Sequence, residues 1–202
     1  MITVESMMSI DKSGLQEASK TVDKEDIPQL VEWLALKDDG IRYQAFLLLQ
    51  NRSVFADDVY PYWDAFRSRL KSGNSYQRSI GLMLIAENVK WDTEERMEDT
   101  IDEYLELLND EKPITIRQCI QSLGKIVAYK PGLNEKIAGR LISFHLMAVK
   151  ETMRKSILLD ILHVLLTVRK ELKTDDIESF IANALSGEIL DKKAKRQIEA
   201  LL

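Results

Sequence analysis

Cysteine, proline and long apolar runs are all scarce in this chain of 202 residues. The single cysteine, Cys119, cannot form an internal disulfide, which fits a reducing compartment, so we expect a cytoplasmic protein. The longest apolar stretches, such as residues 80–86 and 161–168, are shorter than the roughly 20 residues that span a bilayer. The N-terminus lacks the basic start and continuous apolar core of a signal peptide. We therefore expect no membrane as a partner.

The motifs that carry most enzyme chemistry are also missing. There is no phosphate-binding loop, no glycine-rich dinucleotide turn, no His-Glu-x-x-His pattern and no paired-cysteine metal spacing. The two histidines, His145 and His163, would need carboxylate ligands to hold a metal, and Asp160 is the only obvious candidate nearby. Cys119 falls at a tight packing position, where an inert buried thiol is expected. The sequence therefore predicts no enzyme, no cofactor and no metal site.

The composition instead suits amphipathic helices. Hydrophobic residues make up 45% of the chain and charged residues 30%, and no Gly/Ser/Pro-rich linker divides it. No strand-like alternation of any length occurs. The net charge of −5 disfavours unspecific attraction to nucleic acid or to anionic membranes, although a local basic patch would override it.

Residues 110–126 contain the clearest pattern in the chain. Polar residues 110–112 form a turn, and Pro113 fits the first turn of a helix, where its missing N–H costs nothing. Apolar residues follow with the spacing of one helix face: Ile116, Cys119, Ile120, Leu123, Ile126 and Val127. Gly124 inside this helix costs roughly 1 kcal/mol relative to alanine, so we expect another helix to cross closely there.

Four other segments repeat this layout of a polar turn followed by an apolar helix. They cover residues 38–49, 73–84, 150–159 and 192–201. In four of the five copies a small residue precedes a large apolar one, namely Ala45-Phe46, Ser79-Ile80, Cys119-Ile120 and Ser156-Ile157. With Gln197 as the fifth position, the copies are about 34, 40, 37 and 41 residues apart, the range of helical-hairpin repeats. One hairpin cannot bury both of its faces, so neighbouring hairpins are expected to stack.

Residues 39–49 and 110–126 resemble the pattern of HEAT repeats, a family of armadillo-like helical repeats in which an Asp-Pro turn precedes Val-Arg-x-x-Ala-x-x-Ala-Leu-Gly. The resemblance covers residues 25–202. It implies an all-α fold, a right-handed α-solenoid of about five HEAT-like helical hairpins whose second helices line the concave side. The chain departs from the pattern in two places: Arg117 sits one position later than Arg42, and the fifth copy has no small residue. For residues 1–24 we expect either an N-terminal tail or a capping helix.

A polar or basic pair precedes the small position in each copy and supplies the candidate binding residues. These are Gln44, Gln77, Arg78, Arg117, Gln118, Arg154, Lys155, Lys195 and Arg196. If the second helices line a concavity, as the resemblance implies, these side chains form a ladder that binds an acidic peptide or phosphates through charge-assisted hydrogen bonds. The resemblance also implies a structural alternative, in which an arginine here bonds an acidic residue of an adjacent turn. The candidates for that acidic partner are Asp38, Asp39, Asp110 and Glu111.

The three tryptophans are further candidates for recognition, since aromatic residues are enriched in binding hot spots. Trp63 falls on an apolar stripe, so we expect it in the core. Trp33 lies off the stripe of its helix and Trp91 lies at a helix end, and either one is a candidate exposed anchor. The alternative for both is packing against the next repeat.

The leading functional hypothesis is a non-enzymatic scaffold or adaptor that binds a protein or peptide through its concave face. It could also form a homodimer through an apolar end at Ile198, Leu201 and Leu202, because repeat arrays need polar caps to stay soluble. The alternative is a nucleic-acid-binding protein that resembles HEAT-like DNA alkylation repair glycosylases, which use a basic concave face on a similar architecture. The basic ladder and the tryptophans are compatible with this alternative, whereas the acidic net charge is not.

DNA binding measured across a range of salt concentrations separates the two hypotheses. A scaffold with a net charge of −5 is expected to show no binding even at low salt. Affinity that is measurable at low salt and falls steeply as salt is added would favour the nucleic-acid alternative.

Sedimentation at several protein concentrations tests the homodimer hypothesis. The sedimentation coefficient of a dimer falls on dilution as the dimer dissociates, whereas that of a monomer does not change.

Overall fold

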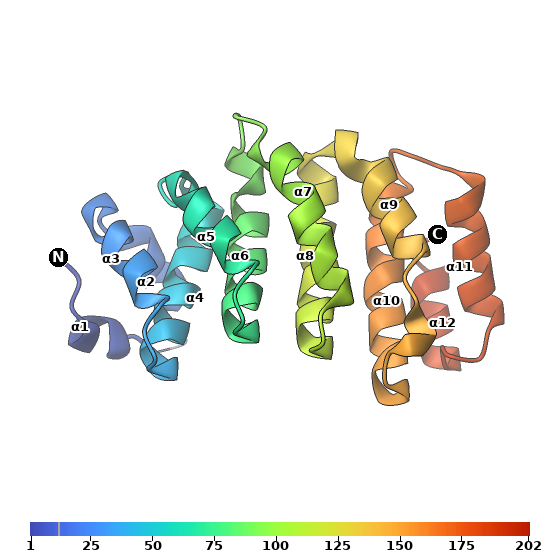
Figure 1. Cartoon of the computed structure of the whole chain (residues 1–202), viewed down its shortest axis with the longest axis horizontal. Coiled ribbons are helices and arrows are strands. Elements are labelled where there is room, and N and C mark those ends of the chain that lie inside the picture. Colours follow the sequence, from blue (N-terminus) through green and yellow to red (C-terminus); the bar gives the residue numbers. More distant parts are fainter. Residues whose placement is uncertain (12) are drawn as a thin grey trace. The chain divides into compact units, whose positions relative to one another are not determined.

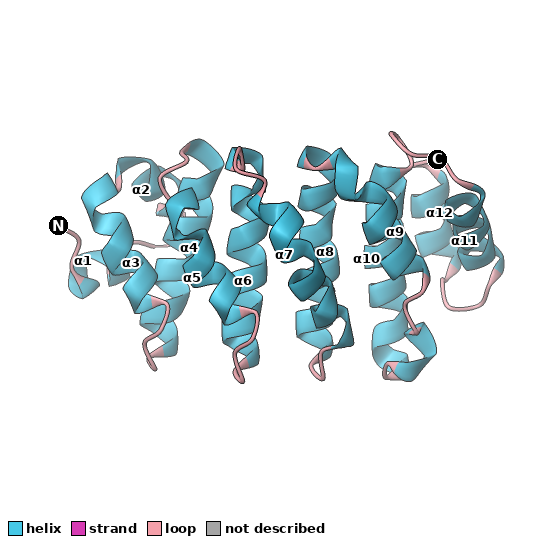
Figure 2. Cartoon of the chain, turned by 45° about the horizontal axis from the view of Figure 1, so that its top comes forward, coloured by secondary structure: helices cyan, strands magenta, loops and turns pink. Residues whose placement is uncertain are grey.

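A computed structural model describes residues 1–11 and 13–202, and every regular element within these residues is a helix (Figure 1). Ten α-helices in this described part pair into five consecutive hairpins joined by short loops, as Figure 2 shows. The hairpins are α3 (Ile27–Trp33) with α4 (Asp39–Phe55), α5 (Trp63–Arg69) with α6 (Ser75–Asn88), α7 (Arg96–Glu106) with α8 (Pro113–Tyr129), α9 (Asn134–Ile142) with α10 (Glu151–Val168), and α11 (Asp175–Ser186) with α12 (Lys192–Glu199). The all-α fold of about five hairpins is therefore confirmed.

Shorter helical elements fill the rest of the described chain. Two α-helices, α1 (Val4–Met8) and α2 (Leu15–Thr21), lie within residues 1–24. Single turns of 3-10 helix stand at the junctions: η1 (Lys24–Asp26), η2 (Tyr60–Tyr62), η3 (Val89–Trp91), η4 (Leu107–Asn109), η5 (Pro131–Leu133) and η6 (Leu146–Ala148). None of the described helices is both long enough and apolar enough to cross a bilayer.

Polar side chains mark where several of the helices begin. The Asp38 carboxylate accepts a hydrogen bond from the Ile41 N–H (2.9 Å) at the start of α4, and the Asp191 carboxylate accepts one from the Ala194 N–H (2.8 Å) at the start of α12. Asn74 and Thr174 act in the same way for α6 and α11. These bonds satisfy amide groups that have no partner within the helix, which explains why the polar turns of the sequence end at these residues.

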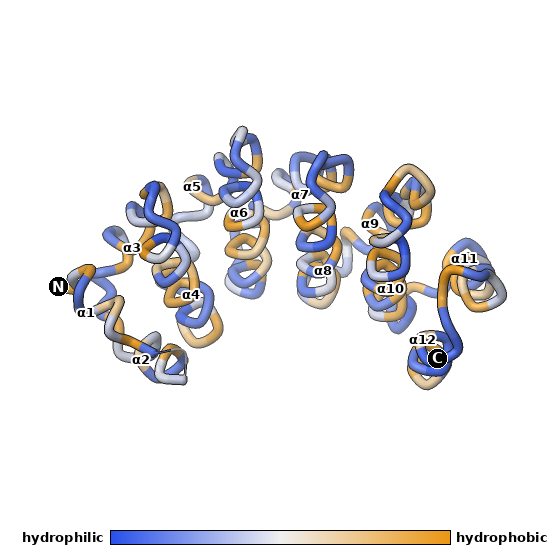
Figure 3. The backbone as a smooth tube through the Cα atoms, turned by 90° about the horizontal axis from the view of Figure 1, so that it is seen from below, coloured by the Kyte–Doolittle hydropathy of each residue, from blue (hydrophilic) through white to orange (hydrophobic). Residues whose placement is uncertain are grey.

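The chain divides into two compact units, residues 1–97 and residues 98–202. Within the first unit, α4 packs against α1, α2, α3 and α6. Its apolar side chains Ala45, Leu48 and Leu49 are fully buried, as are Trp63 and Phe66 of α5. Figure 3 shows that the helices carry both apolar and polar stretches, as expected where one side of each helix is covered and another meets solvent.

Residues 1–21 are tied to this first unit by side chains of α4. The Gln44 amide donates to the carbonyl oxygens of Met7 (3.3 Å) and Ile10 (2.8 Å), and the Met7 side chain is fully buried. The Arg52 guanidinium donates to the Lys20 carbonyl (2.9 Å) and forms a forked pair with the buried Asp58 carboxylate (2.6 and 3.1 Å). Helices α1 and α2 therefore pack against α4 as part of residues 1–97.

Within residues 98–202, α8 and α10 form the centre of the core. The predicted apolar stripe of α8 is buried in full: Ile116, Cys119, Ile120, Leu123, Ile126 and Val127. Helix α10 is apolar on several sides, and it packs against α8, α9, α11 and α12. The Cys119 thiol is fully buried and lies 3.5 Å from the Tyr104 carbonyl oxygen, and burial raises the pKa of that thiol well above its usual range.

Among the glycines of the described residues, Gly81 has the tightest surroundings. Helix α10 does pack against α8, as expected, but the contact at Gly124 is not close enough to require glycine. A Cβ atom at Gly124 would lie 3.8 Å from a methyl group of Val164, an ordinary van der Waals distance. A Cβ atom at Gly81 in α6 would lie 2.7 Å from the Phe66 carbonyl oxygen in α5 and 3.1 Å from the Arg69 Cβ atom. The backbone of α5 therefore leaves no space for any side chain at position 81.

Alanine at the two glycines should change stability in opposite directions. Gly81→Ala is expected to lower the free energy of unfolding by about 1–3 kcal/mol, because the α5 backbone must move away from the new methyl group. Gly124→Ala is expected to raise it by about 0.5–1 kcal/mol, because the methyl group fits and alanine favours the helix. Urea unfolding followed by circular dichroism measures both changes.

Gly139→Ala is the matched control, since that position in α9 has no heavy atom within 4 Å of an added Cβ atom. It should stabilise the chain by a similar amount to Gly124→Ala. A loss of stability in Gly124→Ala, or none in Gly81→Ala, would contradict this account of the crossing.

Candidate binding surface

Three arginines at the start of second helices bind the backbone of the turn that precedes them. The bonds join Arg42 Nη1 to the Leu36 carbonyl (2.9 Å), Arg78 Nη1 to the Ser72 carbonyl (2.8 Å) and Arg154 Nε to the Val149 carbonyl (3.0 Å). Each arginine lies four residues after the residue that caps its helix, and Lys195 occupies the same place in α12. Turn carbonyls need donors, and these long side chains supply them.

Aligning the repeats by these capping residues gives a different register from aligning them by the small residues. Asp38 caps α4 and Asn74 caps α6, so the first two second helices are related by 36 residues rather than about 34. Arg42 is therefore the counterpart of Arg78 and belongs with the candidate residues, although the polar-pair pattern selected Gln44 in its place. The capping residues are the sequence signal that could have identified Arg42, because they mark the start of each helix directly.

Other candidate residues reach across to a neighbouring hairpin. The Gln77 amide donates to the Leu34 carbonyl (2.7 Å), and Lys155 forms an ion pair with Asp191. The Arg117 guanidinium forms a forked pair with Asp160 of α10 (2.6 and 3.2 Å). Asp160 raises the pKa of Arg117 through this hydrogen bond, and Lys155 lowers the pKa of Asp191 in the same way.

These contacts are of the kind that the structural alternative expects, in which an arginine binds an acidic side chain. The acidic partner of Arg117 differs from the expected one. Arg42 pairs with Asp39 of its own turn, as that alternative expects for an arginine and a turn aspartate. Arg117 instead binds Asp160 in the next hairpin. It sits one position later along its helix than Arg42 does, a rotation of about 100°, which turns its side chain away from its own turn.

Three candidate residues lack such contacts among the residues that the structure describes. The Oε1 atom of Gln118 is buried without a hydrogen-bond donor, and no hydrogen bond or ion pair is formed by the side chains of Lys195 and Arg196. Arg196 is exposed and Lys195 is half-buried. A role in partner binding stays a prediction for all nine candidate residues.

Two of the three tryptophans are buried, and the third is half-buried. Trp63 is fully buried, as expected, and Trp33 has only 9% of its surface exposed, so the hypothesis of an exposed anchor at Trp33 is wrong. Trp91 is half-buried, and its indole N–H donates to the Ser53 carbonyl oxygen (2.8 Å). At the apolar end, Ile198 is fully buried, whereas Leu201 and Leu202 remain exposed.

The histidines and acidic residues do not gather around one point. His163 in α10 lies within hydrogen-bond distance of the Leu159 carbonyl (2.7 Å), and His145 lies in the exposed segment after α9. Asp160, the nearby carboxylate, is bound by Arg117. Across residues 1–11 and 13–202, no group of three His, Cys, Asp or Glu side chains is placed to hold a metal ion.

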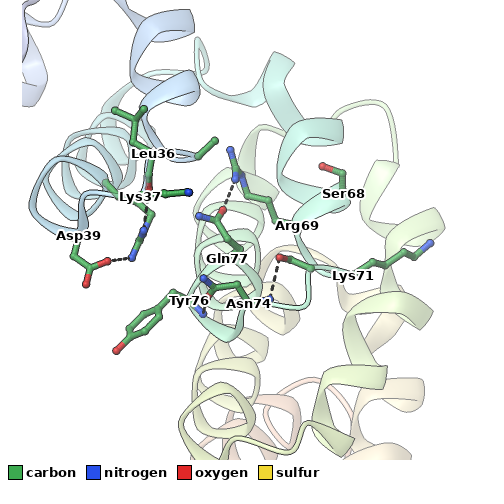
Figure 4. A pocket seen from close by; sticks show the side chains of 12 residues that line it. Leu36, Lys37, Asp39, Ser68, Arg69, Lys71, Asn74, Tyr76 and Gln77 are labelled. Carbon is green, nitrogen blue, oxygen red and sulfur yellow. Dashed lines mark hydrogen bonds and ion pairs between the residues drawn. The ribbon is translucent and has the colours of Figure 1, made fainter.

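A pocket of about 700 Å³ opens in the first unit between the turn that links α3 to α4 and the turn that links α5 to α6; we call it the first turn pocket. Figure 4 shows the side chains around it. They are Ala35, Leu36, Lys37, Asp39, Arg42, Ser68, Arg69, Lys71, Ser72, Asn74, Tyr76 and Gln77. Four of these residues are cationic and one is a carboxylate, so the pocket is positive in a chain whose net charge is negative.

A second pocket of about 660 Å³ occupies the corresponding place in residues 98–202, between the turn before α8 and the segment after α9. Its charged lining consists of the cations Lys112, Arg140 and Lys150 and the carboxylates Asp110 and Glu111. Lys112 pairs with Glu111 (3.4 Å). The two pockets therefore share a position within their hairpins and differ in charge.

The sequence patterns missed the first turn pocket. Arg69 is the last residue of α5 and Lys37 lies between α3 and α4, so both stand outside the polar pairs of the second helices. The only sequence signal is a basic residue near the end of a first helix. That signal is weak, because lysine and arginine are common near helix C-termini for electrostatic reasons.

Comparison with solved structures identifies the fold of the chain. No protein-family model matches the chain, and no curated protein matches it in sequence. A designed armadillo repeat protein, YIII(Dq)4CqI, matches in structure with a TM-score of 0.57 at 14% identity, over 98% of this chain and 96% of that protein. The chain has an armadillo-like helical-repeat fold. An engineered protein of the Northeast Structural Genomics Consortium matches with a TM-score of 0.54 at 15% identity, over 100% of this chain and 96% of that protein.

The armadillo-like fold explains why the two turn pockets correspond. Each hairpin of a repeat fold packs on the next in the same manner, so the turns of neighbouring hairpins lie side by side. A pocket between two turns can therefore form at equivalent places in different pairs of hairpins. The residues of the turns, which the fold does not constrain as strongly as the core, decide what such a pocket can bind.

A double-mutant cycle on Arg117 and Asp160 measures how strongly this pair joins α8 to α10. We expect Arg117→Gln and Asp160→Asn to show a coupling energy of about 0.5–1 kcal/mol in urea unfolding, since the forked pair is partly exposed to solvent. Arg196→Gln combined with Asp160→Asn is the control and should be additive. A coupling of zero for Arg117 would show that it does not join the hairpins and would leave it available to a partner.

Proposed function

We propose that this protein is a non-enzymatic scaffold or adaptor of the HEAT-repeat type that acts in the cytoplasm and binds a protein or peptide. The observation that carries the proposal is the first turn pocket, a positive hollow with exposed apolar and aromatic side chains at its edge. Tyr76 has 68% of its surface exposed and Leu36 has 39%. Exposed tyrosine beside arginine is typical of protein-binding surfaces.

The exposed tyrosines extend the surface beyond the pocket. The Arg42 guanidinium lies 5.7 Å from the centre of the Tyr76 ring, and this contact orients the ring beside α4. Tyr43, the residue after Arg42, has 54% of its surface exposed. Two large rings on neighbouring second helices of the first unit supply contact area at a low cost in side-chain entropy.

Protein binding is favoured over nucleic-acid binding by the same surface. The nucleic-acid alternative requires a basic face along the second helices. Arg42, Arg78 and Arg154, however, donate hydrogen bonds to carbonyl oxygens of the turns. The net charge of −5 acts against a polyanion as a whole. A short segment of a protein partner meets only the local charge of the pocket.

Selection from a random peptide library on the immobilised full chain tests the proposal. We expect a family of related peptides to be enriched, with binding weakened at least threefold by Tyr76→Ala and by Tyr43→Ala, because each change removes exposed aromatic contact area. Tyr129→Ala is the matched control, since Tyr129 in α8 is 55% exposed and belongs to residues 98–202. An equal loss in all three variants, or no enrichment over an unrelated carrier protein, would contradict the proposal.

A further inference from the structure

Arg69 holds a positive charge between two hairpins without a carboxylate partner. Its Nη1 atom donates to the Gln77 side-chain oxygen, and its Nη2 atom donates to the Val31 carbonyl at 3.4 Å. Its Nε atom is buried without an acceptor among the described residues. All of its hydrogen-bond acceptors are therefore neutral, and burial lowers the pKa of the guanidinium.

Several other arginines of the described chain do have a carboxylate partner. Arg52, Arg96, Arg117 and Arg169 each form an ion pair with an acidic side chain. A guanidinium that has lost part of its water shell without gaining a counter-charge destabilises the folded chain. An anion bound from outside would supply that missing charge.

The surroundings of Arg69 favour such an anion. In Figure 4 the Lys37 side chain extends toward Arg69 from the opposite turn, whereas Lys71 points away. The only carboxylate of the pocket, Asp39, is paired with Arg42. Two cations therefore converge on one space in which no free acidic side chain of the pocket lining compensates them.

We propose that the first turn pocket binds an oxyanion carried by a peptide partner, a carboxylate or a phosphorylated side chain, with Arg69 as the anchor and Lys37 as the second contact. Each terminal nitrogen of the guanidinium uses one N–H on the protein and keeps a second one that can bind an oxyanion, and Lys37 adds an adjustable positive charge. The inference rests on the proposed function, since it names the chemical class of the partner.

The size and edge of the pocket indicate a peptide rather than a free ion. A volume of about 700 Å³ is far larger than one oxyanion needs and falls in the range of sites for larger ligands. Leu36 and Tyr76 at the edge provide apolar surface for the residues on either side of the acidic one. The second pocket, with two carboxylates of its own, does not have this charge balance.

Fluorescence anisotropy with three labelled 12-residue peptides tests the inference on the full chain. One peptide carries glutamates among apolar residues, the second replaces each glutamate with glutamine, and the third carries one phosphoserine in place of a central glutamate. We expect the glutamate or the phosphoserine peptide to bind at least tenfold more tightly than the glutamine peptide, and added salt should weaken that binding. The tighter of the two charged peptides identifies the source of the oxyanion.

Variants then assign the binding to the pocket. Arg69→Gln should weaken the charged peptide roughly tenfold, and Lys37→Gln should weaken it roughly threefold. Arg140→Gln in the second pocket is the matched control and should change the affinity less than twofold. Lys37 is exposed and forms no hydrogen bond or ion pair among the described residues, so Lys37→Gln stays informative even if Arg69→Gln loosens the contact between the hairpins.

The two proposals fail in different ways. If library peptides bind through Tyr43 and Tyr76 but neither Arg69→Gln nor Lys37→Gln affects any charged peptide, the oxyanion site is wrong and the protein-binding function stands. If neither library peptides nor the designed peptides bind, both proposals fail. Equal affinity for a single-stranded DNA of the same charge would overturn the assignment of a peptide partner.

Discussion

Burial of the second helices is the constraint on which each compact unit of this protein depends. In residues 1–97, α4 is covered by α1, α2, α3 and α6, and in residues 98–202, α10 is covered by α8, α9, α11 and α12. These helices are apolar on more than one side, so a partner within their own hairpin cannot cover them alone. Neighbouring hairpins must stack, and their turns are brought side by side as a result.

Stacked turns create a second requirement, since turns expose backbone carbonyls that need donors. Donors to these carbonyls come from Arg42, Arg78 and Arg154, each four residues after the residue that caps its helix. These side chains therefore stabilise the turns. Gln77, Arg117 and Lys155 join one hairpin to the next. Several residues that look like a binding ladder in the sequence thus form part of the polar framework of the fold, and their intramolecular contacts occupy some of the donors that a partner would need.

Arg69 stands apart from this framework because its Nε atom is buried without an acceptor among the described residues, and because burial lowers the pKa of its guanidinium. The corresponding pocket in residues 98–202 sets two carboxylates against its three cations, whereas the first turn pocket sets one carboxylate against four. The comparison suggests a division of labour in repeat proteins of this kind. Core positions determine how hairpins stack, and turn positions determine the charge of the hollows between them. The charge of such a hollow can therefore differ from one hairpin to the next.

The sequence by itself determined the helices, their pairing into hairpins and the buried stripe of α8, because these depend on spacing within about 20 residues and on local signals such as caps and prolines. Only the tertiary structure decided that a Cβ atom fits at Gly124 but not at Gly81, and that Trp33 is covered. It alone showed that Arg117 reaches Asp160 and that Arg69 and Lys37 meet in one pocket. The reason is physical: a local pattern shows which side of a helix is apolar, but the neighbour that covers it, and the charges that neighbour brings, come from distant parts of the chain.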